Sequence, residues 1–177
     1  MSDRLIEVKI ESVRVSLLSQ HRIAVLQEKD GDRYLPIWIG PFEAEAIAMQ
    51  LRKEKSPRPL THDLLHQVLL EVAHDPVYVE IASLMDDVYL ARLVFNAEDN
   101  PIMDELDCRA SDALALAVRF GCPIYVDEEV MNAAGKVPDE EIPLDEDVEG
   151  DAPDASSEDL ELFRDVVEGL DLGSLSD

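Results

Sequence analysis

The sequence predicts an α+β fold, with mixed, mainly antiparallel strands and three main helices, followed by an acidic linker and a short C-terminal amphipathic helix. Two observations predict this class. Strand-like and helix-like segments follow one another in a mixed order rather than as repeated strand–helix–strand units. Apolar runs fill most of the first 126 of the 177 residues, which excludes disorder throughout. We therefore expect a domain at residues 1–137, a flexible linker at 138–157, and a short helix and tail at 158–177.

Three strands are expected in the first forty residues. Residues 6–10 alternate between apolar and polar side chains, and the alternation changes phase at residues 13–17. Because a regular strand cannot change phase, we expect a bulge or break near Glu11 and Ser12. The second strand is expected at residues 22–26 and the third at residues 34–39. A hairpin turn at residues 29–32 joins them, and its glycine, Gly31, supplies a positive φ.

Two helices follow. The first begins at Pro41, which suits an initial helical turn, and ends around residues 53–55, before an extended connector that contains two prolines. Thr61 is a suitable N-cap for the second helix. Its apolar residues recur at helical spacing, so we expect the following side chains to face inward: Leu64, Leu65, Val68, Leu69 and Val72.

The rest of the domain contains both kinds of element. Asp86 and Asp87 form a turn between two strands. Ser111 or Asp112 caps a third helix, rich in alanine, which we expect to pack closely against a sheet and to end at Gly121. Three strands are expected before this helix, at residues 77–84, 88–95 and 102–106. One strand is expected after it, at residues 123–126, and a short final helix at residues 127–133.

The net charge of −25 is distributed unevenly. Residues 127–177 carry −17 and residues 1–126 carry −8, so about two-thirds of the excess lies in the last third of the chain. Proteins that bind duplex nucleic acid usually carry a basic footprint, and no basic cluster stands out in this sequence. The charge does not exclude a nucleic-acid substrate. If the protein is a nuclease, the charge predicts that nucleic-acid binding depends on a metal. It also predicts that moderate salt lowers the affinity less than it lowers the affinity of a basic nucleic-acid-binding protein.

The composition also fits adaptation to high salt. The chain has 5 Lys against 10 Arg, and 21 Asp against 19 Glu. A highly charged surface preserves solubility at high salt, where self-repulsion is screened. An acidic tail with a local interaction role explains the charge equally well.

Other features favour a cytoplasmic protein. The first residues lack the charged-then-apolar layout of a signal peptide, and no apolar run approaches the roughly 18–20 residues that span a bilayer. Cys108 and Cys122 could form one disulfide at most, so reduced thiols are the simpler expectation.

His62 and His66 are four residues apart and therefore share one helix face, and Asp63 lies beside the first histidine. The spacing is similar to that of zinc proteases. However, the acid is Asp rather than Glu, and the pattern places no third ligand. We therefore favour a capping Asp and two histidines at the solvent edge.

Polar side chains gather at the starts of the three predicted helices. Free backbone N–H groups and the positive end of the helix dipole can bind phosphate there, and carboxylates from several elements can hold Mg²⁺ or Mn²⁺. His62 could act as a general base, and Arg58 or Arg109 could stabilise a pentacoordinate phosphate. Each residue alone also has a structural interpretation, as a cap or an ion pair. The candidates are Glu43, Arg58, Thr61, His62, Asp63, Asp107, Arg109, Ser111 and Asp112.

Three ordered segments of the sequence carry these candidates. They are residues 35–47 (LPIWIGPFEAEAI), 58–65 (RPLTHDLL) and 106–117 (LDCRASDALALA). The segments resemble the three motifs of the bifunctional nuclease domain family, and the resemblance extends over roughly residues 4–133. It implies an α+β fold and hydrolysis of both DNA and RNA. Ala110 and Cys108 stand where the family usually has Pro and Ala, which could alter the placement of Arg109.

Two functions follow from these observations. The first is a divalent-metal-dependent phosphodiesterase acting on DNA or RNA, in which Arg58 and Arg109 clamp the phosphate and His62 is the base. The metal ligands would be Glu43, Asp63, Asp107 and Asp112, and the substrate-binding residues would be Thr61 and Ser111. The second is a non-catalytic regulatory or protein-interaction module in which the same motifs maintain the fold. In both cases we expect no membrane partner and a homo-oligomer, most simply a dimer.

Overall fold

The computed structural model describes residues 4–15, 22–72, 75–96 and 103–137. The linker and the short helix expected at 138–157 and 158–177 lie outside these ranges. Within them the α+β prediction is confirmed, because a mixed sheet of seven strands is accompanied by four helices. In chain order the elements are β1 (Leu5–Val15), β2 (Arg22–Glu28), β3 (Tyr34–Ile39), α1 (Pro41–Leu51), α2 (Thr61–Val72), β4 (Tyr78–Met85), β5 (Val88–Val94), β6 (Glu105–Arg109), α3 (Ala110–Phe120), β7 (Ile124–Asp127) and α4 (Glu128–Ala134).

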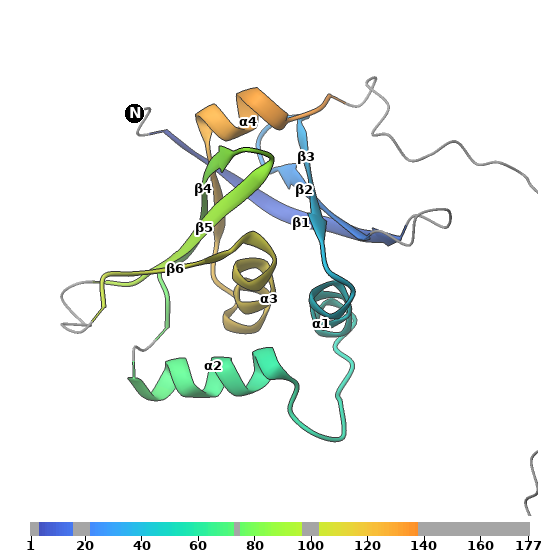
Figure 1. The fold of residues 1–177 in the computed structure, drawn as a ribbon, viewed down its shortest axis with the longest axis vertical. Helices are drawn as coiled ribbons and strands as arrows, with labels where there is room; N and C mark the ends of the chain where they lie inside the picture. Colours follow the sequence, from blue (N-terminus) through green and yellow to red (C-terminus); the bar gives the residue numbers. More distant parts are fainter. Residues whose placement is uncertain (1–3, 16–21, 73–74, 97–102, 138–177) are drawn as a thin grey trace, which may run out of the picture. The chain divides into compact units, whose positions relative to one another are not determined.

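The sheet consists of two antiparallel meanders joined by a late strand. The strand order is β3-β2-β1-β7-β4-β5-β6, and every neighbouring pair is antiparallel except β4 and β7. β7 therefore lies at the centre of the sheet, although it is the last strand in the sequence (Figure 1). Among the described helices none is long and apolar enough to cross a membrane.

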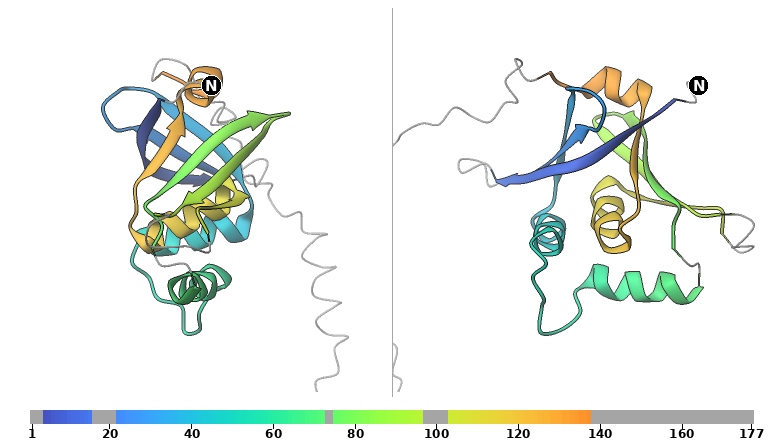
Figure 2. Two further views of the ribbon diagram at one scale, coloured as in Figure 1. Left: turned by 90° about the vertical axis from the view of Figure 1, so that its left-hand side faces the viewer. Right: turned by 180° about the vertical axis from the view of Figure 1, so that it is seen from behind.

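The sheet is strongly curled. The Tyr89 hydroxyl on β5 donates a hydrogen bond of 3.4 Å to the carbonyl of Pro36 on β3, although four other strands separate these two in the sheet order. The two meanders consequently face each other around the core, as the side view in Figure 2 shows. A two-way backbone bridge between Tyr34 and Lys136 ties the segment after α4 to the start of β3.

Local irregularities occur where the sequence pattern changes. The register between β1 and β2 shifts between Ile10 and Ser12, which confirms the predicted bulge. The turn at Asp86 and Asp87 is also confirmed, with φ of 49° and 63°, as expected for a tight two-residue hairpin. The positive φ predicted for Gly31 is wrong, because its hairpin is closed by an Arg33–Glu28 ion pair and by a backbone bond between the same residues.

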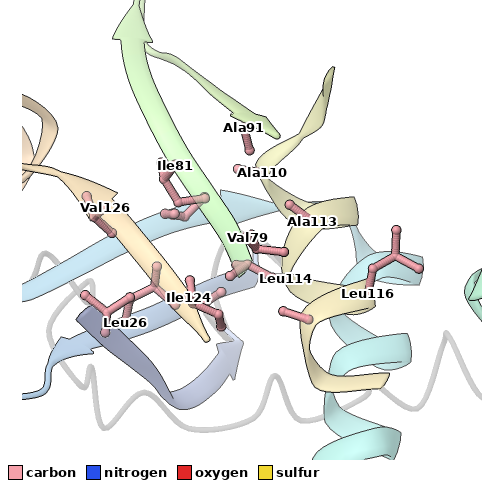
Figure 3. Close-up of a cluster of buried hydrophobic side chains, with 14 of the residues drawn as sticks. Leu26, Val79, Ile81, Ala91, Ala110, Ala113, Leu114, Leu116, Ile124 and Val126 are labelled. Atoms are coloured by element: carbon pink, nitrogen blue, oxygen red, sulfur yellow. The ribbon is translucent and has the colours of Figure 1, made fainter. Parts of the chain in front are cut away.

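The hydrophobic core lies between α3 and the concave face of the sheet (Figure 3). Small side chains on α3 bring the helix close to β4 and β5, and Ala113, Leu114 and Ala115 are completely buried. This confirms the predicted packing of the alanine-rich helix. Gly121 ends the helix with a φ of 68°, also as predicted. Ser111 and Asp112 do not cap it: the helix begins at Ala110, because β6 runs directly into it.

Helix α2 corrects another expectation. It lies outside the layer formed by α1 and α3, and it contacts α3 (Figure 1). Only His62 and Leu69 are buried on it. The side chains predicted to face inward that are instead exposed are Leu64, Leu65, Val68 and Val72. Helical spacing thus identified an apolar face correctly but not what the face contacts.

Candidate functional site

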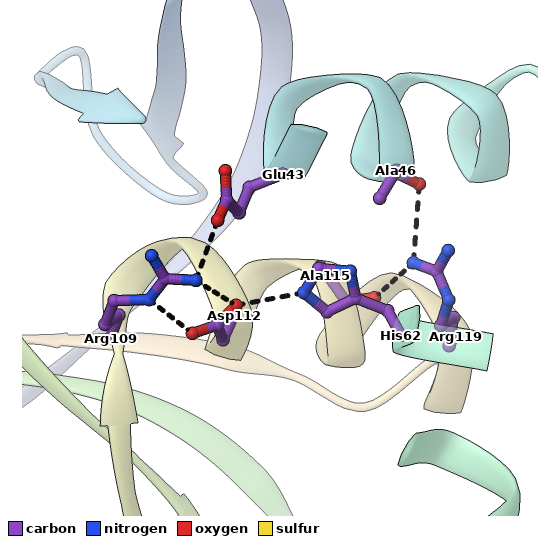
Figure 4. A network of polar contacts seen from close by, with 7 residues as sticks. All are labelled: Glu43, Ala46, His62, Arg109, Asp112, Ala115 and Arg119. Atoms are coloured by element: carbon purple, nitrogen blue, oxygen red, sulfur yellow. Dashed lines mark hydrogen bonds and ion pairs between the residues drawn. The ribbon is translucent and has the colours of Figure 1, made fainter. Parts of the chain in front are cut away.

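Four of the predicted site residues meet at one place, from three helices. Glu43 comes from the first turn of α1 and His62 from the first turn of α2, while Arg109 and Asp112 flank the start of α3. Arg109 Nη2 donates to Glu43 Oε1 at 2.7 Å, and its Nε donates to Asp112 Oδ2 at 2.7 Å. His62 Nε2 lies 2.9 Å from Asp112 Oδ1 (Figure 4). We call these four residues the Arg109 cluster.

The local fold explains why these side chains converge. Pro41 occupies the first turn of α1, where its missing N–H is not needed, and this places Glu43 at the positive end of the helix. Gly40 leaves free the space that the Glu43 carboxylate occupies. On the other side, Arg109 is both the last residue of β6 and the N-cap of α3, so Asp112 lies one helical turn away from it.

The cluster is buried on its acidic side and open on its basic side. The side chains of Glu43 and Asp112 are 14 % and 22 % exposed, whereas that of Arg109 is 68 % exposed. Burial raises the pKa of the Asp112 carboxyl, but hydrogen bonds from Arg109 and His62 outweigh burial and lower it below its usual value. The same carboxylates raise the pKa of Arg109. A solvent-facing guanidinium is therefore held by two carboxylates.

His62 is buried and oriented by a carboxylate. When its Nε2–H donates to Asp112, Nδ1 becomes the proton acceptor of the imidazole. No described residue donates to Nδ1, and no buried side-chain nitrogen or oxygen among the described residues lacks a partner, so Nδ1 retains contact with solvent. An imidazole held in one tautomer by a carboxylate is the arrangement that a general base requires.

A second cluster lies two turns further along α3. Arg119 Nε donates to Asp63 Oδ1 at 2.8 Å. Its Nη1 donates to the carbonyls of Ala46 and Ala115 at 3.3 and 2.7 Å (Figure 4). The other Asp63 oxygen accepts the N–H of Leu60, which closes the start of α2. Burial of the Asp63 carboxyl raises its pKa, but these hydrogen bonds outweigh burial and lower it. This cluster joins α1, α2 and α3.

Comparison with known proteins identifies the family. A model of the bifunctional nuclease domain matches residues 24–139, which include both clusters. The chain belongs to the bifunctional nuclease domain family. An uncharacterized protein of Mycobacterium tuberculosis is 42 % identical over 135 residues, which are 76 % of this chain and 79 % of the relative. Bifunctional nuclease 1 of Oryza sativa subsp. indica is 28 % identical over 114 residues, which are 62 % of this chain and 34 % of the rice protein.

The remaining motif residues of this bifunctional nuclease domain lie outside the Arg109 cluster. Arg58 is exposed in the connector between α1 and α2, and Thr61 is exposed at the start of α2. Asp107 is exposed on β6. Ser111 is buried in the first turn of α3, with 8 % of its surface exposed. Asp63 belongs to the second cluster, where it binds Arg119. Of the nine candidate residues, the structure brings together Glu43, His62, Arg109 and Asp112.

The four carboxylates predicted to bind metal do not form one ligand set. Glu43 and Asp112 share Arg109, Asp63 is bound to Arg119, and no hydrogen bond or ion pair joins Asp107 to them in the described residues. Within those residues no group of three His, Cys, Asp or Glu side chains is placed to hold a metal. The zinc hypothesis gains no support either, because the His66 ring stacks edge-on against Phe120, 4.4 Å away.

Arg119 is a charged residue of these clusters with a buried side chain, and it is not among the candidates predicted from the sequence. Its side chain is only 5 % exposed, and it carries the one cation of the second cluster. The signal was present, because Arg119 follows Asp112 by seven residues and therefore lies on the same face of α3. A charged residue within an otherwise apolar helix face is the pattern that would have pointed to it.

The bifunctional nuclease domain also has a surface hollow that does not coincide with its motifs. The hollow has a volume of about 700 Å³ and lies between β4, β5 and α4. Its most buried polar residue, Glu80, is bound in a fork by Arg92, and Arg92 also binds Glu105. None of its lining residues belongs to the two clusters. We therefore assign the candidate site to the Arg109 cluster.

Proposed function

We propose that the protein is a nuclease that hydrolyses phosphodiester bonds of DNA and RNA at the Arg109 cluster. The observation that carries the proposal is the contact of a carboxylate-oriented His62 with Asp112, which also holds the exposed Arg109. Membership of the bifunctional nuclease domain family and the names of the rice relatives support it.

The cluster contains the groups that phosphodiester hydrolysis needs. His62 Nδ1 accepts a proton from water as the water oxygen bonds to phosphorus. The bond from phosphorus to the leaving sugar oxygen breaks, and the proton taken up by His62 passes to that oxygen. Asp112 holds the imidazole and stabilises its protonated form, by the same logic as in a Ser–His–Asp triad. The exposed Arg109 guanidinium stabilises the charge that develops on the phosphate oxygens.

Assistance by Mg²⁺ or Mn²⁺ is part of the proposal. A resident three-ligand centre does not fit the described side chains, but Mg²⁺ is usually bound through one or two carboxylates together with substrate phosphates. Glu43 and Asp112 are the pair that would hold such an ion. When bound, the ion would supply Lewis-acid polarisation of a phosphate oxygen.

Cleavage of labelled oligonucleotides by nuclease-free preparations tests the proposal. We expect hydrolysis of DNA and RNA that requires Mg²⁺ or Mn²⁺ and stops with EDTA. His62→Ala should lower kcat by about 10²- to 10⁴-fold, because it removes the general base. His66→Ala, a histidine on the same helix but outside the cluster, is the matched control and should retain activity. Equal activity in wild type, His62→Ala and Asp112→Asn would indicate contamination and contradict the proposal.

A non-catalytic module is the second candidate function. The observation that favours it is that Arg109 is already bound by two carboxylates, so the cluster also ties α1 to α3. Thermal unfolding of the same variants discriminates the two functions. If His62→Ala leaves the melting temperature unchanged but abolishes cleavage, the motif is catalytic. If it unfolds the domain and no cleavage is seen even in the wild type, the motif is structural.

A homo-oligomer, most simply a dimer, remains a proposal. The exposed apolar side chains of α2 support it, since Leu64, Val68 and Val72 are each about half exposed on one helix face. Sedimentation equilibrium of the wild type and of the Val68→Glu variant measures the oligomeric state of each protein. A dimer that uses this face should dissociate in the variant.

A further inference from the structure

We propose that the protein takes its nucleic acid as a single strand, held along α1 by two features outside the Arg109 cluster. One is a basic connector, residues 52–58, and the other is the exposed ring of Phe42. The inference rests on the proposed nuclease function and specifies the form of its substrate.

Although no basic cluster stands out over the chain as a whole, the basic connector carries three cations that form no ion pair within the described residues. Residues 52–58 contain four basic residues and one acidic residue, a net charge of +3 in a chain of −25. Arg52 is bound to Glu45 and Glu54. In the part of the chain that the structure describes, Lys53, Lys55 and Arg58 form no ion pair, and all three are exposed.

Most other basic residues are neutralised. Ion pairs with carboxylates hold, for example, Lys29, Arg33, Arg92 and Arg119. In an overall acidic protein, three exposed cations within one seven-residue segment, with no ion pair to any part of the chain that the structure describes, present a local surface for a polyanion. Because each phosphate carries one charge, a nucleic-acid backbone matches such a row of cations.

Phe42 supplies the second feature. It is 86 % exposed, the highest value among the large apolar side chains of the described residues, and it precedes Glu43 of the Arg109 cluster. An aromatic ring so exposed gains nothing from the core. It is suited to stack on a nucleobase, which every base permits regardless of sequence. In a duplex the bases already stack on each other, so a ring at the surface can contact only an unpaired base.

The two features bracket the candidate site. Phe42 lies at the start of α1 and Lys53 just beyond its end, and eleven helical residues span roughly 16 Å. The chain then returns through Arg58 to His62, which is bound to Asp112. A strand that contacts both features therefore runs beside the Arg109 cluster, with a base near Glu43 and its phosphates over the connector.

The basic connector and Phe42 contact phosphate and base without a metal, unlike the metal-dependent binding expected from the net charge alone. Fluorescence anisotropy with a labelled twelve-nucleotide single strand in EDTA, where we expect no cleavage, therefore tests the inference. The variant Lys53→Gln/Lys55→Gln/Arg58→Gln should bind at least tenfold more weakly at low salt. Its dependence of log affinity on log salt should flatten by about 2, since each lost phosphate contact removes about 0.7. Lys9→Gln, which removes an exposed base of β1 with no ion pair among the described residues, is the control and should bind like wild type.

A second variant tests the stacking. Phe42→Ala should weaken binding roughly tenfold, whereas Phe42→Tyr should retain it and an abasic strand should bind wild type and Phe42→Ala equally. A duplex should bind at least tenfold more weakly than the single strand. Wild-type affinity in the triple variant, or equal affinity for duplex and single strand, would overturn the inference. If the strand binds as described but is never cleaved, the proposed nuclease function fails while this binding surface stands.

Discussion

Arg109 joins two helices and also has an exposed edge, to which we have assigned a role in the proposed chemistry. Its guanidinium bonds to Glu43 on α1 and to Asp112 on α3, yet more than half of its own surface remains in solvent. The two carboxylates fix its orientation, and the exposed edge is left for an anionic ligand. Asp112 in turn contacts His62, so a change at this one carboxylate affects both the cation and the imidazole.

Stability should depend on the charge of Asp112. Its pKa is lowered in the folded protein, so its stabilising contribution is present above the usual Asp value of about 4 and is lost as the pH falls through the lower folded value. Asp112→Asn should therefore reduce the free energy of unfolding by about 1–3 kcal/mol at pH 7, and by less at pH 3, where part of this contribution is already lost. Urea unfolding at both pH values measures the difference.

Asp107→Asn provides the control for this prediction. Asp107 lies close by in the sequence but is exposed and outside the cluster, so the substitution should change stability little at either pH. An equal loss at pH 7 and pH 3 in Asp112→Asn would show that shape rather than charge is what the carboxylate contributes.

At the residue level the sequence predicted that polar side chains gather at helix starts, because caps and dipoles act locally. The structure brings four of these side chains together: Glu43, His62, Arg109 and Asp112. Whether helix starts converge depends on tertiary packing, which one sequence does not show. That is why Asp107 and Arg58 were grouped with a cluster that they do not join.

Among the elements, α3 has the most constrained ends. β6 passes into it without a loop, and Gly121 ends it in the left-handed conformation. A Cβ added at Gly121 would meet no atom within 4 Å, so any cost of substitution arises from the backbone alone.

Gly121→Ala should therefore destabilise the protein by about 1 kcal/mol, because a residue with a Cβ disfavours a φ of 68°. Gly121→Asn should cost less, since Asn tolerates this conformation better. Thermal unfolding of the two variants compares them at the same site. Equal losses in both would point to a contact rather than to backbone conformation.

The elements were predicted well wherever local pattern decides their type. The phase change in β1, the turn at Asp86 and Asp87, and the end of α3 follow from alternation and from residues that adopt positive φ. The packing of α2 could not be predicted in this way. An apolar helix face indicates that something covers it or that it is exposed for a purpose, and periodicity alone does not distinguish the two.

For the whole molecule, the acidic composition leads to a prediction about salt. The net charge is −25, so the acidic side chains repel one another at low ionic strength, and salt screens this repulsion. If the composition reflects salt adaptation, the melting temperature should rise as KCl increases from 0.1 to 2 M. A gain of about 1 kcal/mol corresponds to roughly 4 °C for a domain of this size.

Differential scanning calorimetry of the full chain and of residues 1–137 measures the effect. Salt adaptation predicts a gain in both proteins. A melting temperature that does not respond to KCl in residues 1–137 would instead assign the charge to a local role of the acidic residues that follow.

The α+β class followed from the mixed order of elements, but the strand order did not. Nothing in the alternation of residues 123–126 indicates that they belong between β1 and β4 rather than at an edge. Partners in a sheet are chosen by contacts between distant segments, which hydrophobic periodicity does not encode.

The central position of β7 also bears on how the protein forms. During synthesis the meander β1–β3 and the meander β4–β6 leave the ribosome first. β3 and β6 remain the outer edges of the finished sheet, whereas the edges at β1 and β4 are covered only once Ile124–Asp127 has been made and inserted between them. Until then these two further strand edges are unpaired in the same chain, which is the condition that favours incorrect pairing. The seven-stranded sheet is thus completed in a single late event, after its six other strands have been made.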